Sequence, residues 1–245
     1  TDKSSENGTE EGYQLMDLAK WAIDHLLNHL EKVYKLEHVA VLAYANQCDL
    51  VVPFIRDIPE VRAKVTTIDC FDSSNIIAGL KGLVNFVLEQ WGNTAYINIL
   101  VVTDGGQGHG NKSFKNFMEN KSLLDREILL PFSFNGTMNF LMINQMEPEI
   151  LETVALYEKL IDRCGLRGQV LIPSESPQQS LTRASVEKSV QNLIDTHYQP
   201  FIGTFTLSKK SRKSREATQS RTPLTKIFTE NSKFQEIETK VDLSF

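Results

Sequence analysis

From residue 39 to residue 198, short apolar runs alternate with longer stretches in which apolar residues recur every three or four positions. Strands are predicted by the runs INILVVT, MNFLMI and QVLI, and helices by the stretches between them, such as ETVALYEKLIDRC. Strands that alternate with helices form an open, mostly parallel sheet with helices on both faces. The chain is therefore predicted to have an α/β, Rossmann-like fold.

An antiparallel pair of strands is predicted before this alternation begins. The runs HVAVLAYA and LVVPFI are separated only by the turn-like NQCD, and so short a link joins neighbouring antiparallel strands. We expect the first run to be buried. We expect the second run to form an edge strand, because Pro53 has no N–H to donate to a neighbour.

Two long helices flank this hairpin in the prediction. The first covers residues 15–33, where leucines recur at helical spacing. The second extends from about Asn75 to Trp91, with Gly92 as its stop and Trp91 in the core. Asp72, Ser73 and Ser74 are all available as caps at its start. This places a cluster of side-chain oxygens just before a helix.

Charge and composition change near residue 207. Residues 1–207 carry 17 Lys and Arg against 26 Asp and Glu, whereas residues 208–245 carry 9 against 5. We predict a disordered segment over 1–12, the α/β domain over 13–200 and the first strand of a further domain over 201–207. A basic, disordered tail is predicted over 208–245. With its acidic balance, the α/β domain is not expected to bind nucleic acid unaided.

The stretch VVTDGGQGHGNKS, residues 101–113, is the most informative segment for function. A dinucleotide turn is disfavoured, because Asn111 stands where G-x-G-x-x-G needs its third glycine. A P-loop fits better, since residues 106–113 match G-x-x-x-x-G-K-S except at Asn111. However, Thr103 and Asp104 intervene before the first glycine, and no later apolar strand ends in aspartate. Nucleotide binding remains an alternative.

A third interpretation of the same stretch is a cation site. A carboxylate at the tip of a buried strand, followed by glycines that turn the backbone, is suited to a hard cation or its bound water. Asp104 has this position. Divalent cations of this class take about six oxygens, so other loops at the same edge have to contribute. The FDSSN loop before the second helix is the candidate, and capping of that helix is its simpler role.

The order helix, hairpin, D-S-S loop, helix and strand ending in V-T-D-G resembles that of von Willebrand factor type A domains. Such domains carry a metal-ion-dependent adhesion site built from three loops. By this resemblance Ser74 takes the place of the family's second-loop threonine and Asp104 that of its third-loop aspartate. The first loop, D-x-S-x-S after a central strand, is absent from this sequence, and residues 2–6 do not replace it. The resemblance thus implies an incomplete site, with Mg²⁺ held only where that first loop is present.

A narrower resemblance is carried by EQWGNTAYINILVVTDGGQGHG, LYEKLIDRCGLRGQVLIP and DTHYQPF. These segments are similar to a family of Integrator complex subunits over about residues 12–207. The resemblance implies a nuclear, non-catalytic scaffold in small nuclear RNA 3′-end processing and in attenuation of transcription by RNA polymerase II. It also implies a heterodimer with Integrator subunit 13, contact with subunit 10, and a share in nucleic-acid contact within that assembly. A metal-dependent ligand receptor is the second alternative.

Overall fold

A computed structural model gives the fold of the chain and describes most of its first 198 residues. The described ranges are 13–34, 37–69, 74–94, 96–105, 111–120, 128–144, 148–173 and 181–198, together with residues 206–207 and 239–240. The chain divides into two compact units, Thr1–Gln199 and Pro200–Phe245. In the second unit, β6 (Thr206–Leu207) pairs antiparallel with β7 (Thr239–Lys240).

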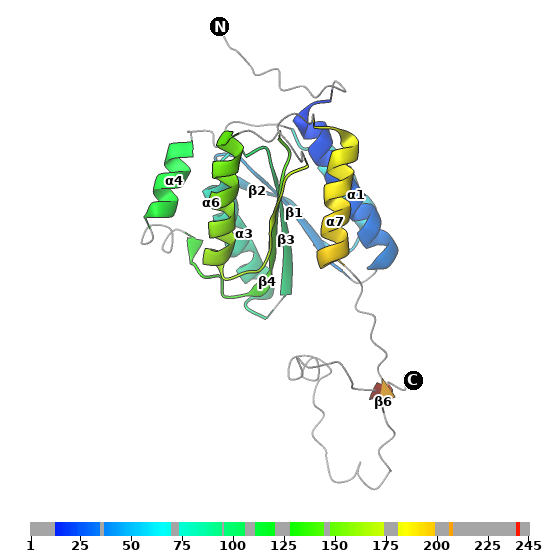
Figure 1. Ribbon diagram of the computed structural model, residues 1–245. Coiled ribbons are helices and arrows are strands. Elements are labelled where there is room, and N and C mark those ends of the chain that lie inside the picture. The colour runs from blue at the N-terminus through cyan, green and yellow to red at the C-terminus, as the bar shows by residue number, and fades with distance from the viewer. Residues whose placement is uncertain are drawn as a thin grey trace, which may run out of the picture. The chain divides into compact units, whose positions relative to one another are not determined.

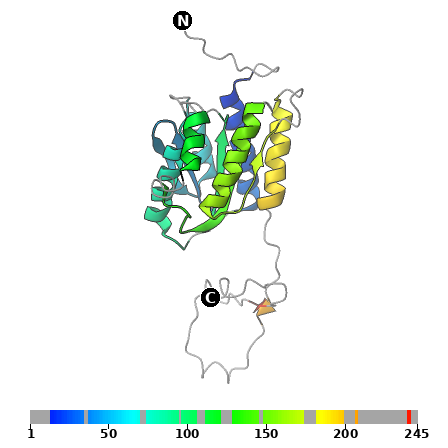
Figure 2. The same ribbon diagram turned by 60° about the vertical axis from the view of Figure 1, so that its left-hand side comes forward.

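The first unit has three layers, with strands between two groups of helices (Figure 1). One group contains α1 (Leu15–Val33), α2 (Ile58–Thr66) and α7 (Arg183–His197). The other contains α3 (Ile76–Trp91), α4 (Asn111–Glu119) and α6 (Pro148–Cys164). The turned view shows α4 beside α6 (Figure 2). Helices thus cover both faces of the strands, as the alternating pattern predicts.

The strands of the first unit form two separate sheets. β1 (Val39–Tyr44) and β2 (Cys48–Ile55) make the predicted antiparallel hairpin. β3 (Tyr96–Thr103), β4 (Asn135–Met142) and β5 (Val170–Leu171) make a parallel sheet in the order β3-β4-β5. Within the described ranges, no backbone hydrogen bonds join β1 to β3. Such a split is what a sheet without its central strand would have.

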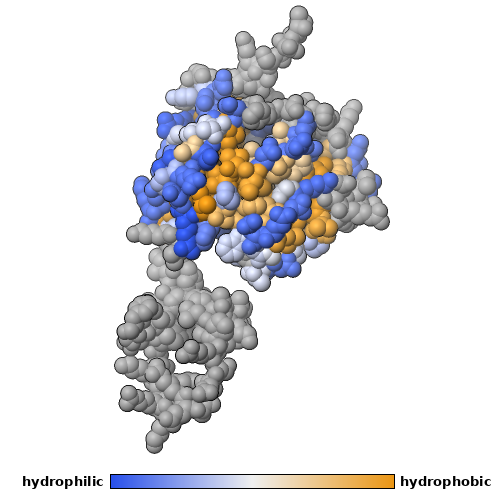
Figure 3. Space-filling model, turned by 180° about the vertical axis from the view of Figure 1, so that it is seen from behind, coloured by the Kyte–Doolittle hydropathy of each residue, from blue (hydrophilic) through white to orange (hydrophobic). Residues whose placement is uncertain are grey.

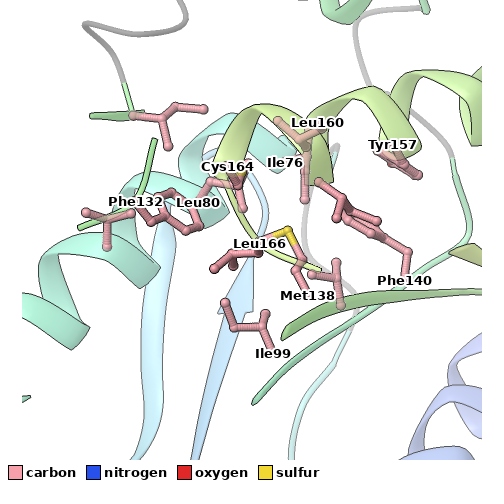
Figure 4. Packing of buried hydrophobic residues seen from close by; sticks show 14 of the residues in the cluster. Ile76, Leu80, Ile99, Phe132, Met138, Phe140, Tyr157, Leu160, Cys164 and Leu166 are labelled. Atoms are coloured by element: carbon pink, nitrogen blue, oxygen red, sulfur yellow. The ribbon is translucent and has the colours of Figure 1, made fainter. Parts of the chain in front are cut away.

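The two helical groups bury two apolar clusters against opposite faces of the strands. β4 contributes to both, because Met138, Phe140 and Met142 face one cluster while Leu141, together with Ile143 just after the strand, belongs to the other. All five side chains are at most 1% exposed. Phe140 stacks on Tyr157 of α6 at 4.4 Å between ring centroids, and Figure 4 shows Met138 and Ile99 beside them. β4 is therefore the most deeply buried strand of the described part.

The core also takes in the segment before β4. Ile128, Phe132 and Phe134 are buried, and Phe132 stacks on Phe134 at 5.0 Å. Three apolar residues of the segment DREILLPFSF, residues 125–134, thus pack against the domain, while Leu129 is exposed. Residues 121–127, at the start of that stretch, lie outside the described ranges.

Three predictions at the hairpin and α3 were wrong. β1 is only half-buried at all six positions, although its apolar sequence predicts a fully covered strand. The physical reason is that its second edge lacks a neighbouring strand among the described residues. Trp91, expected in the core, is 43% exposed because it follows the last buried turn of α3. Asn75, and not Ser74, caps α3, its side chain accepting from the N–H groups of residues 77 and 78.

Two glycines allow α3 to lie very close to the hairpin. A Cβ atom at Gly79 would lie 2.9 Å from Cγ of Tyr44, and one at Gly82 would overlap Cβ and Sγ of Cys48. A glycine inside a helix makes the helix about 1 kcal/mol less stable than an alanine does. Two glycines in one helix are therefore best explained by packing. Close approach of the helix to β1 and β2 supplies that reason.

The two cysteines in the described ranges carry free thiols. Cys164 is fully buried, and burial raises its pKa to about 12. Cys48 is half-buried, and burial followed by the charge of Asp49 raises its pKa as well. Neither thiol is a reactive thiolate at neutral pH. No helix among the described residues is long and apolar enough to cross a bilayer.

The contact between α3 and the hairpin leads to a stability prediction. Replacing Gly82 by Ala should lower the free energy of unfolding by about 1–2 kcal/mol, because overpacking outweighs the gain in helix propensity. Urea denaturation measures the change. In a Cys48→Gly background the same replacement should become neutral or stabilising, since the overlapping atoms are gone. Equal losses in both backgrounds would contradict the packing explanation.

Candidate functional site at the carboxyl edge of the strands

The carboxyl end of β3 holds the residues that the sequence singles out. Thr103 is the last residue of the strand and is buried, whereas Asp104 directly after it is exposed. Gly105 has φ +77°, and its N–H donates to Oγ1 of Thr103 at 3.1 Å. The chain therefore turns sharply just past Asp104, as its glycines predict, and leaves the Asp104 carboxylate at the surface.

The neighbouring strand end fixes this turn from the other side. Asn144, two residues after β4, donates its side-chain N–H to the backbone carbonyl of Asp104 at 2.8 Å. A Cβ atom at Gly105 would lie 2.6 Å from Cε of Met142, the mobile end of a flexible side chain, so it is mainly the positive φ of Gly105 that favours glycine at this turn. The backbone of Asp104 is thus held by two strand ends. No local sequence pattern indicates this role of Asn144.

The hairpin reaches the same edge through Tyr44, the last residue of β1. Its hydroxyl is hydrogen-bonded to the side chain of Thr103. Burial raises the pKa of Tyr44 to about 12, the Thr103 bond opposes this rise, and the charge of Asp104 adds to it. A tyrosine side chain rather than a backbone ladder connects the ends of β1 and β3. The position at a strand end was the only sequence signal for this role.

Ser74 lies two residues before α3 and is partly buried. The same helix contacts Tyr44 at Gly79, one turn further along, so α3 begins near the edge at which Tyr44 meets Thr103. Residues 70–73, which include Asp72 and Ser73, lie outside the described ranges. Ser74 and Asp104 are therefore the two predicted ligands that the structure describes, one from α3 and one from β3.

These two side chains do not make a complete cation site by themselves. They supply one carboxylate and one hydroxyl, whereas Mg²⁺ and Ca²⁺ take six or more oxygens. Within the described part of the chain, no group of three or more His, Cys, Asp or Glu side chains is placed to hold a metal ion. Further oxygens would have to come from other segments.

The residues that would bind a nucleotide lie mostly outside the described ranges. Gly106 to Gly110 are not described, and neither are the side chains of Lys112 and Ser113. What the structure does place is the end of β3 at Thr103 and the start of α4 at Asn111. Nucleotide binding by residues 106–113 therefore stays a prediction.

Strand order, edge hairpin and the V-T-D-G turn agree with one family of α/β domains. Residues 2–107 match the sequence model of the von Willebrand factor type A domain. This chain contains a von Willebrand factor type A domain. The D319A mutant of the PilB minor pilin from Streptococcus sanguinis supports the same fold at 10% sequence identity, with a TM-score of 0.56. That match covers 74% of this chain and 53% of the pilin chain.

Among curated proteins, the chain that carries this type A domain is similar to Integrator complex subunit 14. It is 33% identical to the Drosophila melanogaster protein over 169 residues, which cover 66% of this chain and 28% of that protein. It is 30% identical to the Homo sapiens protein over 197 residues, which cover 79% of this chain and 37% of that protein. The chain thus spans about a third of the length of these relatives.

Alkaline titration tests the Tyr44–Thr103 link in the type A domain. Because burial raises the folded-state pKa of Tyr44, its contribution to stability is complete below pH 10. It is lost as the pH rises toward about 12. Tyr44→Phe should cost about 1 kcal/mol at pH 7 through loss of the Thr103 hydrogen bond. Its free energy of unfolding should also fall less steeply between pH 10 and pH 12 than that of the unchanged protein, measured by urea denaturation. Parallel pH profiles would contradict the buried hydroxyl.

Proposed function

We propose that this chain is a non-catalytic scaffold subunit of an Integrator-type complex and acts by docking to other subunits. Similarity of 30–33% to Integrator complex subunit 14 over 66–80% of the chain is the observation that carries this proposal. The work of such a complex would be small nuclear RNA 3′-end processing and attenuation of RNA polymerase II transcription in the nucleus.

In this proposal, Integrator subunit 13 is the heterodimer partner and subunit 10 a second contact. Nucleic acid would be bound by the assembled module rather than by this domain, whose residues up to 207 carry nine more acidic than basic side chains. At the carboxyl edge, Asp104 is the carboxylate that we assign to the site among the described residues. We propose that Ser74 and Asp104 belong to a metal-ion-dependent adhesion site that needs ligands from a further loop, and that docking does not depend on it.

An exposed aromatic surface near the other end of the strands is our candidate for docking. Trp91 is 43% exposed, and Tyr96, at the start of β3, is 66% exposed. Trp91 meets His38 edge-on at 5.5 Å and Phe54 at 5.8 Å. Phe54 in turn stacks on Phe86 of α3. Trp91 is therefore held in place before any partner arrives, which lowers the entropy lost on binding.

Arg56 adds a cationic donor beside this surface. Its Nε donates to Nε2 of His38 at 3.1 Å, which fixes the imidazole against Trp91. Trp, Tyr and Arg are the residues most enriched among those that dominate binding energy at protein interfaces. The aromatic surface formed by Trp91 and Tyr96, with His38 and Arg56 at its side, is thus suited to a protein partner.

Alanine substitution at the aromatic surface tests the docking role. Trp91→Ala and Tyr96→Ala should each weaken binding to Integrator subunit 13 by about tenfold or more, because each removes an anchor from the interface. Calorimetry with purified partner gives the affinity, and thermal unfolding checks that the variants stay folded. Leu151→Ala on α6 is a matched control, since Leu151 is 50% exposed and lies away from these aromatics in sequence. Unchanged affinity in both variants would exclude this surface.

Removal of the candidate metal ligand separates a scaffold from a metal-dependent receptor. Asp104→Asn and addition of a chelator should both leave the affinity for subunit 13 unchanged, because a scaffold does not use the cation for docking. The same calorimetric titration measures this. Loss of binding in both treatments would favour the metal-dependent receptor instead, since such receptors bind ligand through the cation itself.

A further inference from the structure

A groove of about 360 Å³ lies between α4 and α6, and its lining residues come from these two helices. Figures 1 and 2 show the two helices side by side in front of the strands. The groove is therefore separate from the hydrophobic surface that is seen from behind, between hydrophilic bands, in Figure 3. It also shares no lining residue with the carboxyl edge or with the aromatic surface.

The floor of the groove is apolar. Met118 of α4 is 8% exposed, Leu156 of α6 is half-buried, and both pack in the apolar cluster of α3, α4 and α6. At one end, Nη1 of Arg163 donates to the backbone carbonyl of Met118 at 3.0 Å and ties α6 to the end of α4. A volume of 360 Å³ is near the lower limit for ligand pockets. The groove therefore suits one or two large apolar side chains rather than a whole helix.

Two lysines stand on opposite walls of the groove. Because α4 follows β3 and α6 follows β4 in a parallel sheet, the two helices run in the same direction. Lys115 lies about one turn before Met118, and Lys159 lies about one turn before Arg163. Both lysines are exposed, and neither has an ion-pair partner in the described part of the chain. Two positive charges thus face the same stretch of the groove.

The acidic residues of the lining lie at the other end. Glu119 follows Met118 directly and Asp162 directly precedes Arg163, so both are close to the Arg163 guanidinium, whose charge offsets theirs. The two lysines are left as the unbalanced charge of the groove, and carboxylates are their complement. A nucleic acid fits less well, because its row of phosphates would also meet Glu119 and Asp162.

We propose that the groove between α4 and α6 binds an acidic peptide segment that carries one or two large apolar side chains. The apolar side chains would lie on Met118 and Leu156, and the carboxylates would pair with Lys115 and Lys159. Exposed ion pairs contribute little by themselves, so the affinity has to come mainly from apolar burial, while the charges select the partner. This inference does not depend on which complex the chain joins.

Peptide titration of the full chain tests the proposal. The probe GDEFLDEG carries both features, whereas GDEAADEG lacks the apolar pair and GKKFLKKG has the opposite charge. In fluorescence anisotropy, the probe should bind about tenfold more tightly than either control, because each control lacks one of the two contacts. Equal affinity of the two acidic peptides would indicate charge attraction alone and overturn the proposal. So would the absence of probe binding up to about 1 mM.

Charge reversal in the protein tests the role of the two lysines. The double variant Lys115→Glu and Lys159→Glu should bind the probe about tenfold more weakly and GKKFLKKG more tightly, because the walls of the groove then attract cations. Lys32→Glu is the matched control, since Lys32 is also exposed but lies on α1 in the other helical group. Thermal unfolding checks that the variants fold. Unchanged affinity in the double variant, or an equal loss in the control, would overturn the proposal.

NMR on the unchanged protein locates the bound peptide without any variant. Addition of the probe should shift the amide signals of α4 and α6 around Met118 and Leu156, and GDEAADEG at the same concentration should shift them much less. Shifts confined to other helices, or equal shifts with both peptides, would contradict binding in this groove.

Discussion

The structure depends on the burial of β4 between two apolar clusters. Its alternate side chains face opposite helical groups, so Met138 and Phe140 pack with α3, α4 and α6, while Leu141, with Ile143 just after the strand, packs with α1, α2 and α7. A strand with this double role cannot shift by one residue, because every side chain would then face the wrong cluster. The parallel register of β3 on β4, and hence the position of Thr103 at the carboxyl edge, follows from this constraint.

The candidate site takes its geometry from strand ends and not from a dedicated ligand shell. Thr103 closes β3, Asn144 follows β4, and Tyr44 closes β1, so three strands converge on the backbone that carries Asp104. The hydrogen bonds of Thr103, Asn144 and Tyr44 hold the turn in position. The side chain of Asp104 lies exposed at this edge, which suits either one ligand of a larger site or a surface contact. That arrangement is consistent with a binding role.

Sequence patterns predicted the elements of the fold and the position of Asp104, because apolar periodicity and glycine turns are local signals. They failed where burial or capping depends on contacts with residues that are distant in the sequence. The apolar run Val39–Tyr44 reads as buried, yet its exposure depends on what lies along its second edge. Trp91 and the choice of Asn75 over Ser74 as cap depend on where α3 meets the hairpin. The hydroxyl link from Tyr44 to Thr103 joins residues 59 positions apart in the sequence and has no local signature.

The missing side chains of Gly79 and Gly82 have a mechanical consequence. Because the helix backbone lies directly on Tyr44 and Cys48, no compressible layer separates α3 from the hairpin. The two therefore move as one rigid body. A displacement of β1 relative to β3 would therefore carry the start of α3, and with it Ser74, relative to Asp104. The spacing of β1 and β3 and the relative position of Ser74 and Asp104 would in this way change together.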